Sequence, residues 1–225
     1  MGKFFADKGI KTAAIYGAFI PNPMHVYRTA GVLAGLGLSY GGATTEEDVV
    51  GLIFADQGID LSKISGDIKI VSYLQGYGDT TTDEINAAIQ AAPEAFISVG
   101  MATTFFTQQL NAAGIEFSDI DSFTKSNGEA ITNGKLVYLA GKYSSSVGPA
   151  FALVMNAING NVIRDAQGNA VSLSQNYQVA TDSETFDKFY KNDNGDNPIY
   201  SRDTLDQIIG DTVTFDTINE VVASN

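Results

Sequence analysis

The sequence predicts an α/β fold in three layers, with a parallel β-sheet between two layers of helices. Short β-rich runs alternate with helical stretches along most of the chain, and this alternation is typical of right-handed βαβ units. Hydrophobic residues make up 44% of the 225 residues, which supplies enough apolar material for a core. The length corresponds to one large domain or to roughly one and a half ordinary ones.

The first predicted elements are a helix end, a strand and an amphipathic helix. Residues 3–8 read as the last turns of a helix, because Gly9 follows them as a C′ glycine. Residues 11–16 (KTAAIY) predict a strand directly after it. Residues 24–36 predict a helix, since apolar residues recur at i, i+4 and i+7 and form one face: Val26, Ala30 and Leu33.

Two capping boxes mark the next two helices, and a strand lies between them. Thr44 and Glu47 form the first box, and four residues of the following helix are expected to point inward: Val49, Val50, Ile53 and Phe54. Residues 68–72 (IKIVS) predict the strand. Thr81 and Glu84 form the second box, which opens a helix with one apolar stripe: Ile85, Ala88, Ile89 and Ala92.

The remaining strands of the predicted sheet follow in quick succession. Pro93 is expected to end the preceding helix, and residues 95–99 (AFISV) predict a third strand. Residues 103–113 predict a helix that ends at Gly114, again a C′ glycine. Residues 115–123 and 136–140 predict the fourth and fifth strands.

The last third of the chain is less regular. Residues 148–158 (GPAFALVMNAI) are apolar nearly all round, so we expect a helix that is buried on most sides. Residues 177–180 predict a strand, and residues 183–190 and 201–209 predict two short helices. We therefore expect an α/β ligand-binding lobe over residues 1–142. Residues 143–225 are expected to form a crossover helix and returning segments that pack on the same lobe.

The composition excludes several classes of function. The chain has 13 Lys and Arg against 26 Asp and Glu, and its net charge of −13 argues against nucleic acid and anionic lipid as partners. It has no cysteine, a single histidine (His25) and no G-x-S-x-G motif, so we expect no enzymatic activity, cofactor or metal. No apolar run approaches the ~18 residues of a membrane span, and the first residues lack the apolar core of a signal peptide.

A ligand site is expected beyond the carboxyl ends of the parallel strands, where loops and helix N-termini converge. These loops and the predicted helix over residues 24–36 contain nine candidate ligand-binding residues: Phe19, Arg28, Tyr73, Gln75, Tyr77, Met101, Thr124, Lys142 and Tyr143. Aromatic faces combined with hydrogen-bonding groups suit a sugar, which has both C–H surface and hydroxyls.

Four of these candidates also have a purely structural interpretation. Tyr73 and Tyr77 could simply cover the edge of the sheet, since tyrosine is often partly buried. Arg28 could be a solvated helix residue, and Lys142 an ordinary surface residue. His25 is expected at the surface of the helix start.

Four segments occur in an order and spacing that resemble a known family. They are residues 8–15 (KGIKTAAI), residues 25–31 (HVYRTAG), residues 96–110 followed by Gly114, and residues 147–150 (VGPA) followed by an apolar helix to Gly160. This order resembles the type I solute-binding proteins, the ribose-binding-like group that shares its fold with the effector domains of lac-repressor-type regulators. The resemblance covers most of the chain and begins at the family's second lobe.

The resemblance implies a single, C-terminal lobe of the type I periplasmic-binding-protein fold with crossover segments. It implies that Arg28 contacts ligand. Gly100 and Met101 stand where the family has an Asn-Asp pair, Thr124 stands where it has the Asp of G-F-D, and Lys142 with Tyr143 lies near its hinge Gln.

The implied function is binding of a sugar or related polar solute by the C-terminal lobe of a solute-binding protein that serves an ABC importer. Such a protein closes at a hinge over its ligand and presents it to a membrane permease. The full-length protein would be extracytoplasmic, either periplasmic or a cell-surface lipoprotein. An effector-binding domain of a transcriptional regulator or sensor is the second hypothesis, and an α/β enzyme is the third.

The apolar helix from Phe151 to Ile158 gives a further expectation. In the family this helix returns to the first lobe, which has no counterpart in this sequence. We therefore expect self-association or swapped packing through this helix.

Overall fold

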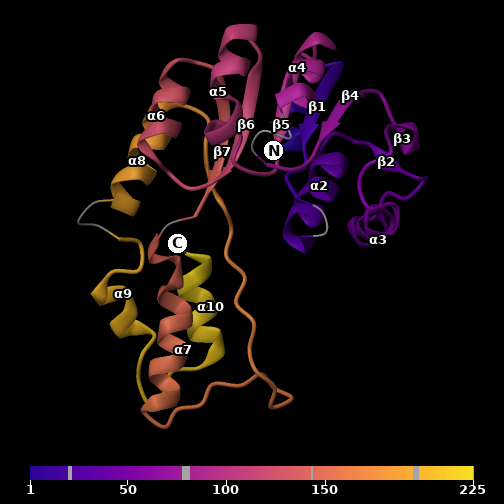
Figure 1. Cartoon of the computed structure of the whole chain (residues 1–225). Coiled ribbons are helices and arrows are strands. Elements are labelled where there is room, and N and C mark those ends of the chain that lie inside the picture. The colour runs from indigo at the N-terminus through magenta and orange to yellow at the C-terminus, as the bar shows by residue number, and fades with distance from the viewer. Residues whose placement is uncertain (20–21, 78–81, 143, 195–197, 225) are drawn as a thin grey trace. The chain divides into compact units, whose positions relative to one another are not determined.

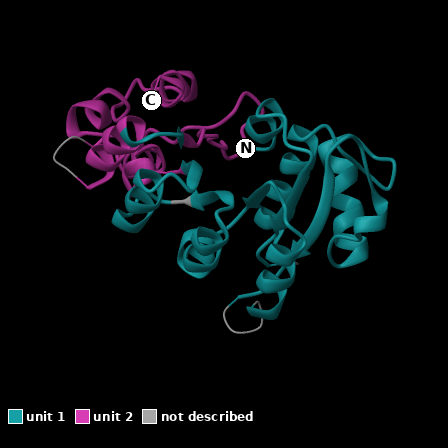
Figure 2. Cartoon of the chain, turned by 90° about the horizontal axis from the view of Figure 1, so that it is seen from above, with its two compact units in different colours: residues 1–140, 179–183 teal, residues 141–178, 184–225 magenta. Residues whose placement is uncertain are grey.

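The computed structural model describes residues 1–19, 22–77, 82–142, 144–194 and 198–224 (Figure 1). The chain forms two compact units (Figure 2). Unit 1 comprises residues 1–140 and 179–183, and unit 2 comprises residues 141–178 and 184–225. The predicted boundary after residue 142, and the packing of residues 143–225 on the α/β lobe, stay predictions.

The main sheet has six strands in the order β4-β1-β5-β6-β7-β8 (Figure 1). The strands are β1 (Thr12–Tyr16), β4 (Lys69–Leu74), β5 (Ala95–Ser98), β6 (Glu116–Asp121), β7 (Leu136–Gly141) and β8 (Gln178–Ala180). β1 pairs in parallel with β4 and with β5, and β5 pairs in parallel with β6. Because β4 and β5 flank β1 on opposite sides, the strand order reverses at β1, which is where open α/β sheets bind ligands.

Helices cover both faces of this sheet. They are α1 (Gly2–Asp7), α2 (Pro23–Gly35), α3 (Glu46–Asp56), α4 (Thr82–Gln90), α5 (Ala102–Ala113) and α6 (Lys125–Thr132). Phe5, Leu33 and Ile53, from α1, α2 and α3, share one core cluster with the β1 residue Ile15. Tyr16, the next residue of β1, points to the other face and meets Phe106 of α5 edge to face, with ring centroids 4.9 Å apart. The predicted three-layer architecture is confirmed.

Most of the local signals in the sequence coincide with element ends, and one is displaced. Gly9 and Gly114 follow α1 and α5 with φ of +78° and +71°, the left-handed conformation expected of such glycines. The cap of α3 is Thr45, whose hydroxyl accepts from the Asp48 N–H at 3.3 Å, so the prediction of Thr44 is wrong by one residue. Thr81, the predicted cap of α4, lies outside the described residues.

Two helices and a small ribbon have no counterpart in the prediction. α6 spans eight residues and buries only two apolar side chains, which is too short a pattern to recognise. α10 (Phe215–Ala223) likewise buries two. A second sheet pairs β2 (Ser39–Tyr40) with β3 (Ile64–Ser65), which follows the 3₁₀ turn η1 (Leu61–Lys63).

Unit 2 is built mainly from helices around a smaller core. Its elements are η3 (Ser144–Val147), α7 (Gly148–Ile158), α8 (Ser183–Asn194), α9 (Arg202–Gln207) and α10. Ala152, Tyr200, Ile208, Ile218 and Val222 form the core.

The burial predicted for α7 is wrong on one face of the helix. Val147, Phe151, Val154 and Ile158, spaced by four, three and four residues, form an apolar stripe that is 48–70% exposed. The described part of unit 2 covers the opposite side, where Ala152 and Asn156 are fully buried. The helix is apolar all round, and the described part of unit 2 packs against one of its faces.

Candidate functional site

Two loops are joined at the carboxyl ends of β1 and β4. The Gly17 N–H donates to Leu74 O at 2.8 Å, and the Gly76 N–H donates to Ala18 O at 2.6 Å. The Tyr16 hydroxyl also donates to Gly76 O at 2.8 Å. The parallel pairing of the strands therefore continues into the loops that carry Phe19 and Tyr77.

The consequence is an aromatic strip, formed by Phe19, Tyr77 and Phe105. The rings of Phe19 and Tyr77 are stacked with centroids 6.3 Å apart and planes 27° apart, and Tyr77 lies 5.7 Å from Phe105 of α5. Phe19 and Tyr77 are 47% and 45% exposed, so about half of each side chain is open to solvent. Phe105 in turn packs on the buried Phe106, which anchors the strip to the core.

Phe105 was absent from the sequence-predicted set, because a residue in the first turns of a helix carries no sign that it will face a loop 28 positions earlier in the chain. The only available signal was its position directly after the loop that contains Met101.

Arg28 lies at the point where the strand order reverses. Its guanidinium Nη1 donates to Val99 O at 3.0 Å, directly after β5, although Arg28 itself belongs to α2 after β1. The side chain is partly buried and holds this hydrogen bond, which does not fit the interpretation of Arg28 as a solvated helix residue. A guanidinium held here presents hydrogen-bond donors to the loops that follow β1 and β5.

Tyr73 and Gln75 line a neighbouring cavity of about 320 Å³. Its other lining residues include three acidic side chains: Asp56, Asp60 and Glu84. The Tyr73 hydroxyl is buried beneath Gly17, and burial raises the pKa of this phenol above its ordinary value. Lys63 offsets part of the negative charge through an ion pair of 2.7 Å with Asp56.

Gly17 is expected to be intolerant of any side chain. A Cβ at this position would lie 1.9 Å from the Tyr73 hydroxyl oxygen and 2.3 Å from its Cζ. We expect Gly17→Ala to lower the free energy of unfolding by about 1–3 kcal/mol in urea titrations, because the buried ring has to move. The matched control is Gly31→Ala on α2, where an added Cβ meets nothing within 4 Å and should stabilise the helix by about 0.5–1 kcal/mol. Equal stabilities of the two variants would contradict this prediction.

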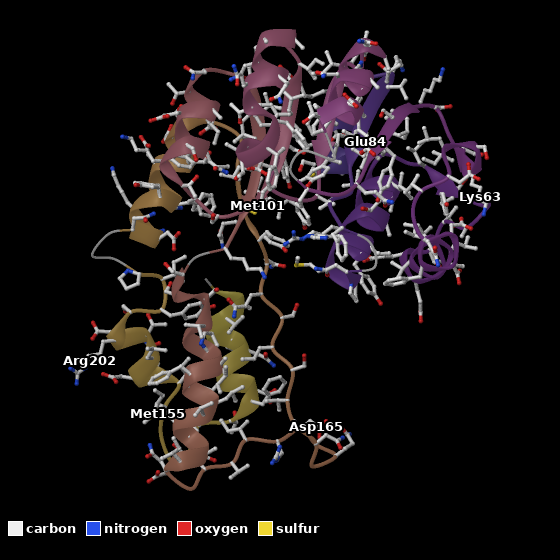
Figure 3. The ribbon with its side chains drawn as sticks, viewed as in Figure 1. Lys63, Glu84, Met101, Met155, Asp165 and Arg202 are labelled. Carbon is white, nitrogen blue, oxygen red and sulfur yellow. The ribbon has the colours of Figure 1, made fainter. Side chains whose placement is uncertain are left out.

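Met101 and Thr124 lie at helix N-termini. Met101, labelled in Figure 3, is the N-cap of α5 and its side chain is 42% exposed. Thr124 is the N-cap of α6, and its hydroxyl accepts from the Asn127 N–H at 3.2 Å. The Thr124 hydroxyl therefore already has a structural role as a helix cap.

A buried carboxyl joins these two helix starts. Asp119 of β6 is 3% exposed and accepts hydrogen bonds from the Thr103 N–H at 3.3 Å and from the Asn127 amide at 3.1 Å. The Ile120 N–H donates to its other oxygen at 3.0 Å. Burial raises the pKa of Asp119 to about 7, although these hydrogen bonds favour the charged form. Asp119 thus ties the N-termini of α5 and α6 to the sheet.

His25 is buried, at 6% exposure, so the expectation of a surface histidine is wrong. It lies on the first turn of α2, where the helix packs on the sheet, and its ring contacts the backbone of Phe19. The periodicity of the helix could not reveal this contact, because it is made to a loop.

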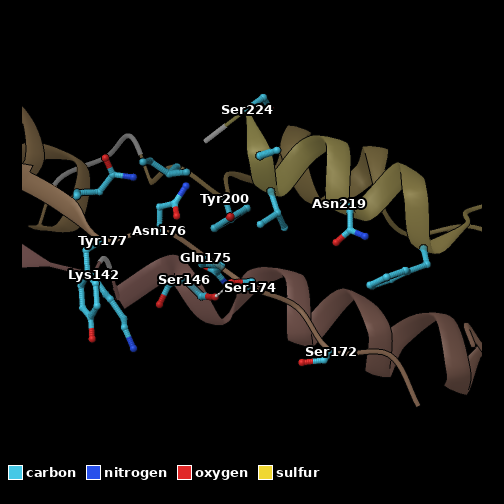
Figure 4. Close-up of a pocket in the computed structure, with 15 residues that line it drawn as sticks. Lys142, Ser146, Ser172, Ser174, Gln175, Asn176, Tyr177, Tyr200, Asn219 and Ser224 are labelled. Atoms are coloured by element: carbon cyan, nitrogen blue, oxygen red, sulfur yellow. Dashed lines mark hydrogen bonds between the residues drawn. The ribbon is translucent and has the colours of Figure 1, made fainter. Parts of the chain in front are cut away.

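Lys142 belongs to unit 2, where its ammonium lies 5.3 Å from the centre of the Tyr177 ring. Both residues line a cavity of about 750 Å³ (Figure 4). The cavity is lined by serines and amides as well as by Tyr200, and the Gln175 amide donates to Ser146 O at 2.8 Å. Tyr143 lies outside the described residues.

Unit 1 thus combines three features at the carboxyl ends of β1, β4 and β5: an exposed aromatic strip, a positioned guanidinium and an acidic cavity. Among the described residues, no group of three or more His, Asp or Glu side chains is arranged to hold a metal ion. None of the described helices is long and apolar enough to cross a membrane. This arrangement suits non-covalent binding of a polar molecule that has an apolar face.

Comparison with known proteins places the fold. No protein-family model and no curated relative matches the sequence. The chain is similar to the periplasmic binding protein component of the arabinose ABC transporter from Shewanella sp. ANA-3, solved with α- and β-L-arabinofuranose, with a TM-score of 0.52 and 16% identity. The match covers 86% of this chain and 58% of that chain.

A second solved structure is a periplasmic solute-binding protein of an ABC transporter from Actinobacillus succinogenes 130z with bound D-allose. It matches with a TM-score of 0.49 and 15% identity over 84% of this chain and 58% of that chain. The chain therefore spans 58% of the length of each of these proteins. The sheet order, the helices on both faces and the likeness to the arabinose-binding structure agree: the chain has a type I periplasmic-binding-protein-like fold.

Proposed function

We propose that this chain binds a sugar or a related small polar solute as the C-terminal lobe of a solute-binding protein that serves an ABC importer. The observation that carries the proposal is that the aromatic strip and Arg28 both lie at the carboxyl ends of the strands where the strand order reverses. A pyranose or furanose ring has one apolar face of C–H groups that stacks on aromatic rings, while its hydroxyls accept hydrogen bonds from a guanidinium.

The proposed role is binding without turnover. In this role the ligand favours a closed arrangement of two lobes only to the extent that it contacts both of them. The proposal places the full-length protein outside the cytoplasm, as a periplasmic protein or a cell-surface lipoprotein, with the membrane permease as its partner. Turnover of a bound sugar by this chain would contradict the proposal.

The direct test is isothermal titration calorimetry of the protein against a panel that contains L-arabinose, D-allose and nucleosides. For any sugar that binds, we expect Phe19→Ala and Tyr77→Ala each to raise the dissociation constant about 3- to 10-fold. This change corresponds to the loss of one aromatic contact. Tyr27→Ala is the matched control, since Tyr27 is a 49% exposed aromatic residue of α2 outside the strip. Absence of binding for every sugar, or equal losses in all three variants, would contradict the proposal.

The apolar stripe of α7 carries the proposal of self-association. We expect light scattering to detect a dimer or higher oligomer in the wild type, because Val147, Phe151, Val154 and Ile158 leave a row of apolar side chains exposed. Phe151→Glu should shift the protein to the monomer. Ala157→Glu, an exposed position on the same helix outside the stripe, should leave the oligomer intact. A wild type that is monomeric at all concentrations would contradict this expectation.

A further inference from the structure

The loop that carries Phe19 has a strained backbone. Ala18 adopts φ of +55°, the left-handed conformation that L-residues other than Asn and Asp rarely adopt. Its side chain is fully buried, and its neighbour Gly17 is pressed against the Tyr73 ring. A conformation of this kind persists only where surrounding contacts hold it.

His25 supplies one of these contacts. Its Nδ1 lies 3.0 Å from the backbone nitrogen of Phe19 and 3.0 Å from the Phe19 carbonyl oxygen. An unprotonated Nδ1 accepts from the N–H, and a protonated Nδ1 donates to the carbonyl, so the ring keeps one hydrogen bond to Phe19 in either tautomer.

The helix itself does not require this histidine. The N-cap of α2 is Asn22, whose side chain accepts from the Met24 N–H at 3.0 Å, and Pro23 occupies the first helical position. The imidazole therefore binds the loop, and the residue that it holds, Phe19, contributes the ring that stacks on Tyr77 in the aromatic strip.

We propose that His25 is a positioning residue, whose Nδ1 holds the backbone of Phe19 and thereby sets the Phe19 ring against Tyr77 in the aromatic strip. The claim that this placement serves ligand binding rests on the proposed function. The contact between His25 and the loop does not, and it can be tested without ligand.

The test compares His25→Asn, His25→Gln and His25→Leu by limited proteolysis with chymotrypsin, which cleaves after phenylalanine. The Asn side chain can place a polar atom where Nδ1 lies, whereas the Gln amide reaches the position of Nε2. We expect cleavage after Phe19 to be about 5- to 10-fold faster in the Leu and Gln variants, as loss of one hydrogen bond implies, and to stay within about 2-fold of the wild type in His25→Asn.

Urea midpoints of the same proteins separate a local effect from a global one. Faster cleavage after Phe19 with rescue by Asn, at similar midpoints, supports the proposal. Wild-type cleavage in His25→Leu overturns it, and so does an Asn variant that is cleaved as fast as the Leu variant.

Calorimetry with L-arabinose and D-allose then addresses the ligand. A sugar that binds the wild type should bind His25→Leu about 5-fold more weakly and His25→Asn nearly as well. Equal affinity in the wild type and His25→Leu would overturn the role in binding. If no sugar binds the wild type, the proposed function fails, while the cleavage pattern still decides whether His25 positions the loop.

Discussion

Replacing Asp119 with asparagine is expected to remove much of the fall in stability that the wild type shows as the pH rises from 5 to 8. The folded-state pKa of this carboxyl is raised by burial to about 7, from an ordinary value of 3.8. Between these two values the folded protein holds a proton that the unfolded chain has lost. The stability that the protonated group contributes is therefore present at low pH and is lost as the pH rises towards 7.

The size of this effect follows from the width of the shift. Ionisation of the Asp119 carboxyl in the folded protein should lower the free energy of unfolding by on the order of 3 kcal/mol between pH 5 and pH 8. The amide of the Asp119→Asn variant cannot ionise, so the difference between the wild type and this variant should shrink or reverse over this range, as measured by urea unfolding at each pH. Asp83→Asn removes the same charge from an exposed position of α4 and should show no such trend. A wild-type advantage over Asp119→Asn that is constant or grows with pH would contradict the prediction.

Asn156→Ala is expected to destabilise unit 2 by about 2–4 kcal/mol. The side chain is fully buried in α7, its amide donates to Ile208 O at 2.9 Å, and its carbonyl oxygen accepts from the Gly210 N–H at 2.8 Å. Alanine would leave a backbone acceptor and a backbone donor without their partner in the unit's core, and each such loss costs about 1–3 kcal/mol.

Two further variants make the Asn156 prediction specific. Asn159→Ala, an exposed position at the end of the same helix, should change stability little. Asn156→Asp keeps the acceptor for Gly210 but loses the donor to Ile208 and buries a carboxylate, so it should be at least as destabilising as alanine at pH 8. The three proteins are compared by circular dichroism in urea, and equal midpoints for Asn156→Ala and Asn159→Ala would contradict the prediction.

The sheet and its helices were predictable because their signals are local. The β-rich runs predicted all six strands of the sheet, and the helical runs between them predicted α2, α3, α4 and α5. Gly9 and Gly114 marked helix ends because only a glycine adopts a positive φ there without strain. Short elements were not predictable: α6 and α10 each bury two apolar residues, too few for a period to emerge.

The candidate site was predictable as a region but not as a set of contacts. The topology rule selected the loops after β1, β4 and β5, and two of the candidate residues there, Phe19 and Tyr77, are stacked in the structure. The rule had no means to distinguish them from Thr124, whose hydroxyl caps α6. Whether these residues contact ligand stays a prediction.

The amino-acid sequence by itself determined the three-layer α/β class and the order of the main elements, and it predicted the edge of the sheet where a ligand is expected. Only the tertiary structure decided that His25 is buried against Phe19, that Phe105 completes the aromatic strip and that one face of α7 is left exposed. The physical reason is one of range. Periodicity and capping depend on residues a few positions apart, whereas these three features depend on which distant segment packs against each side chain.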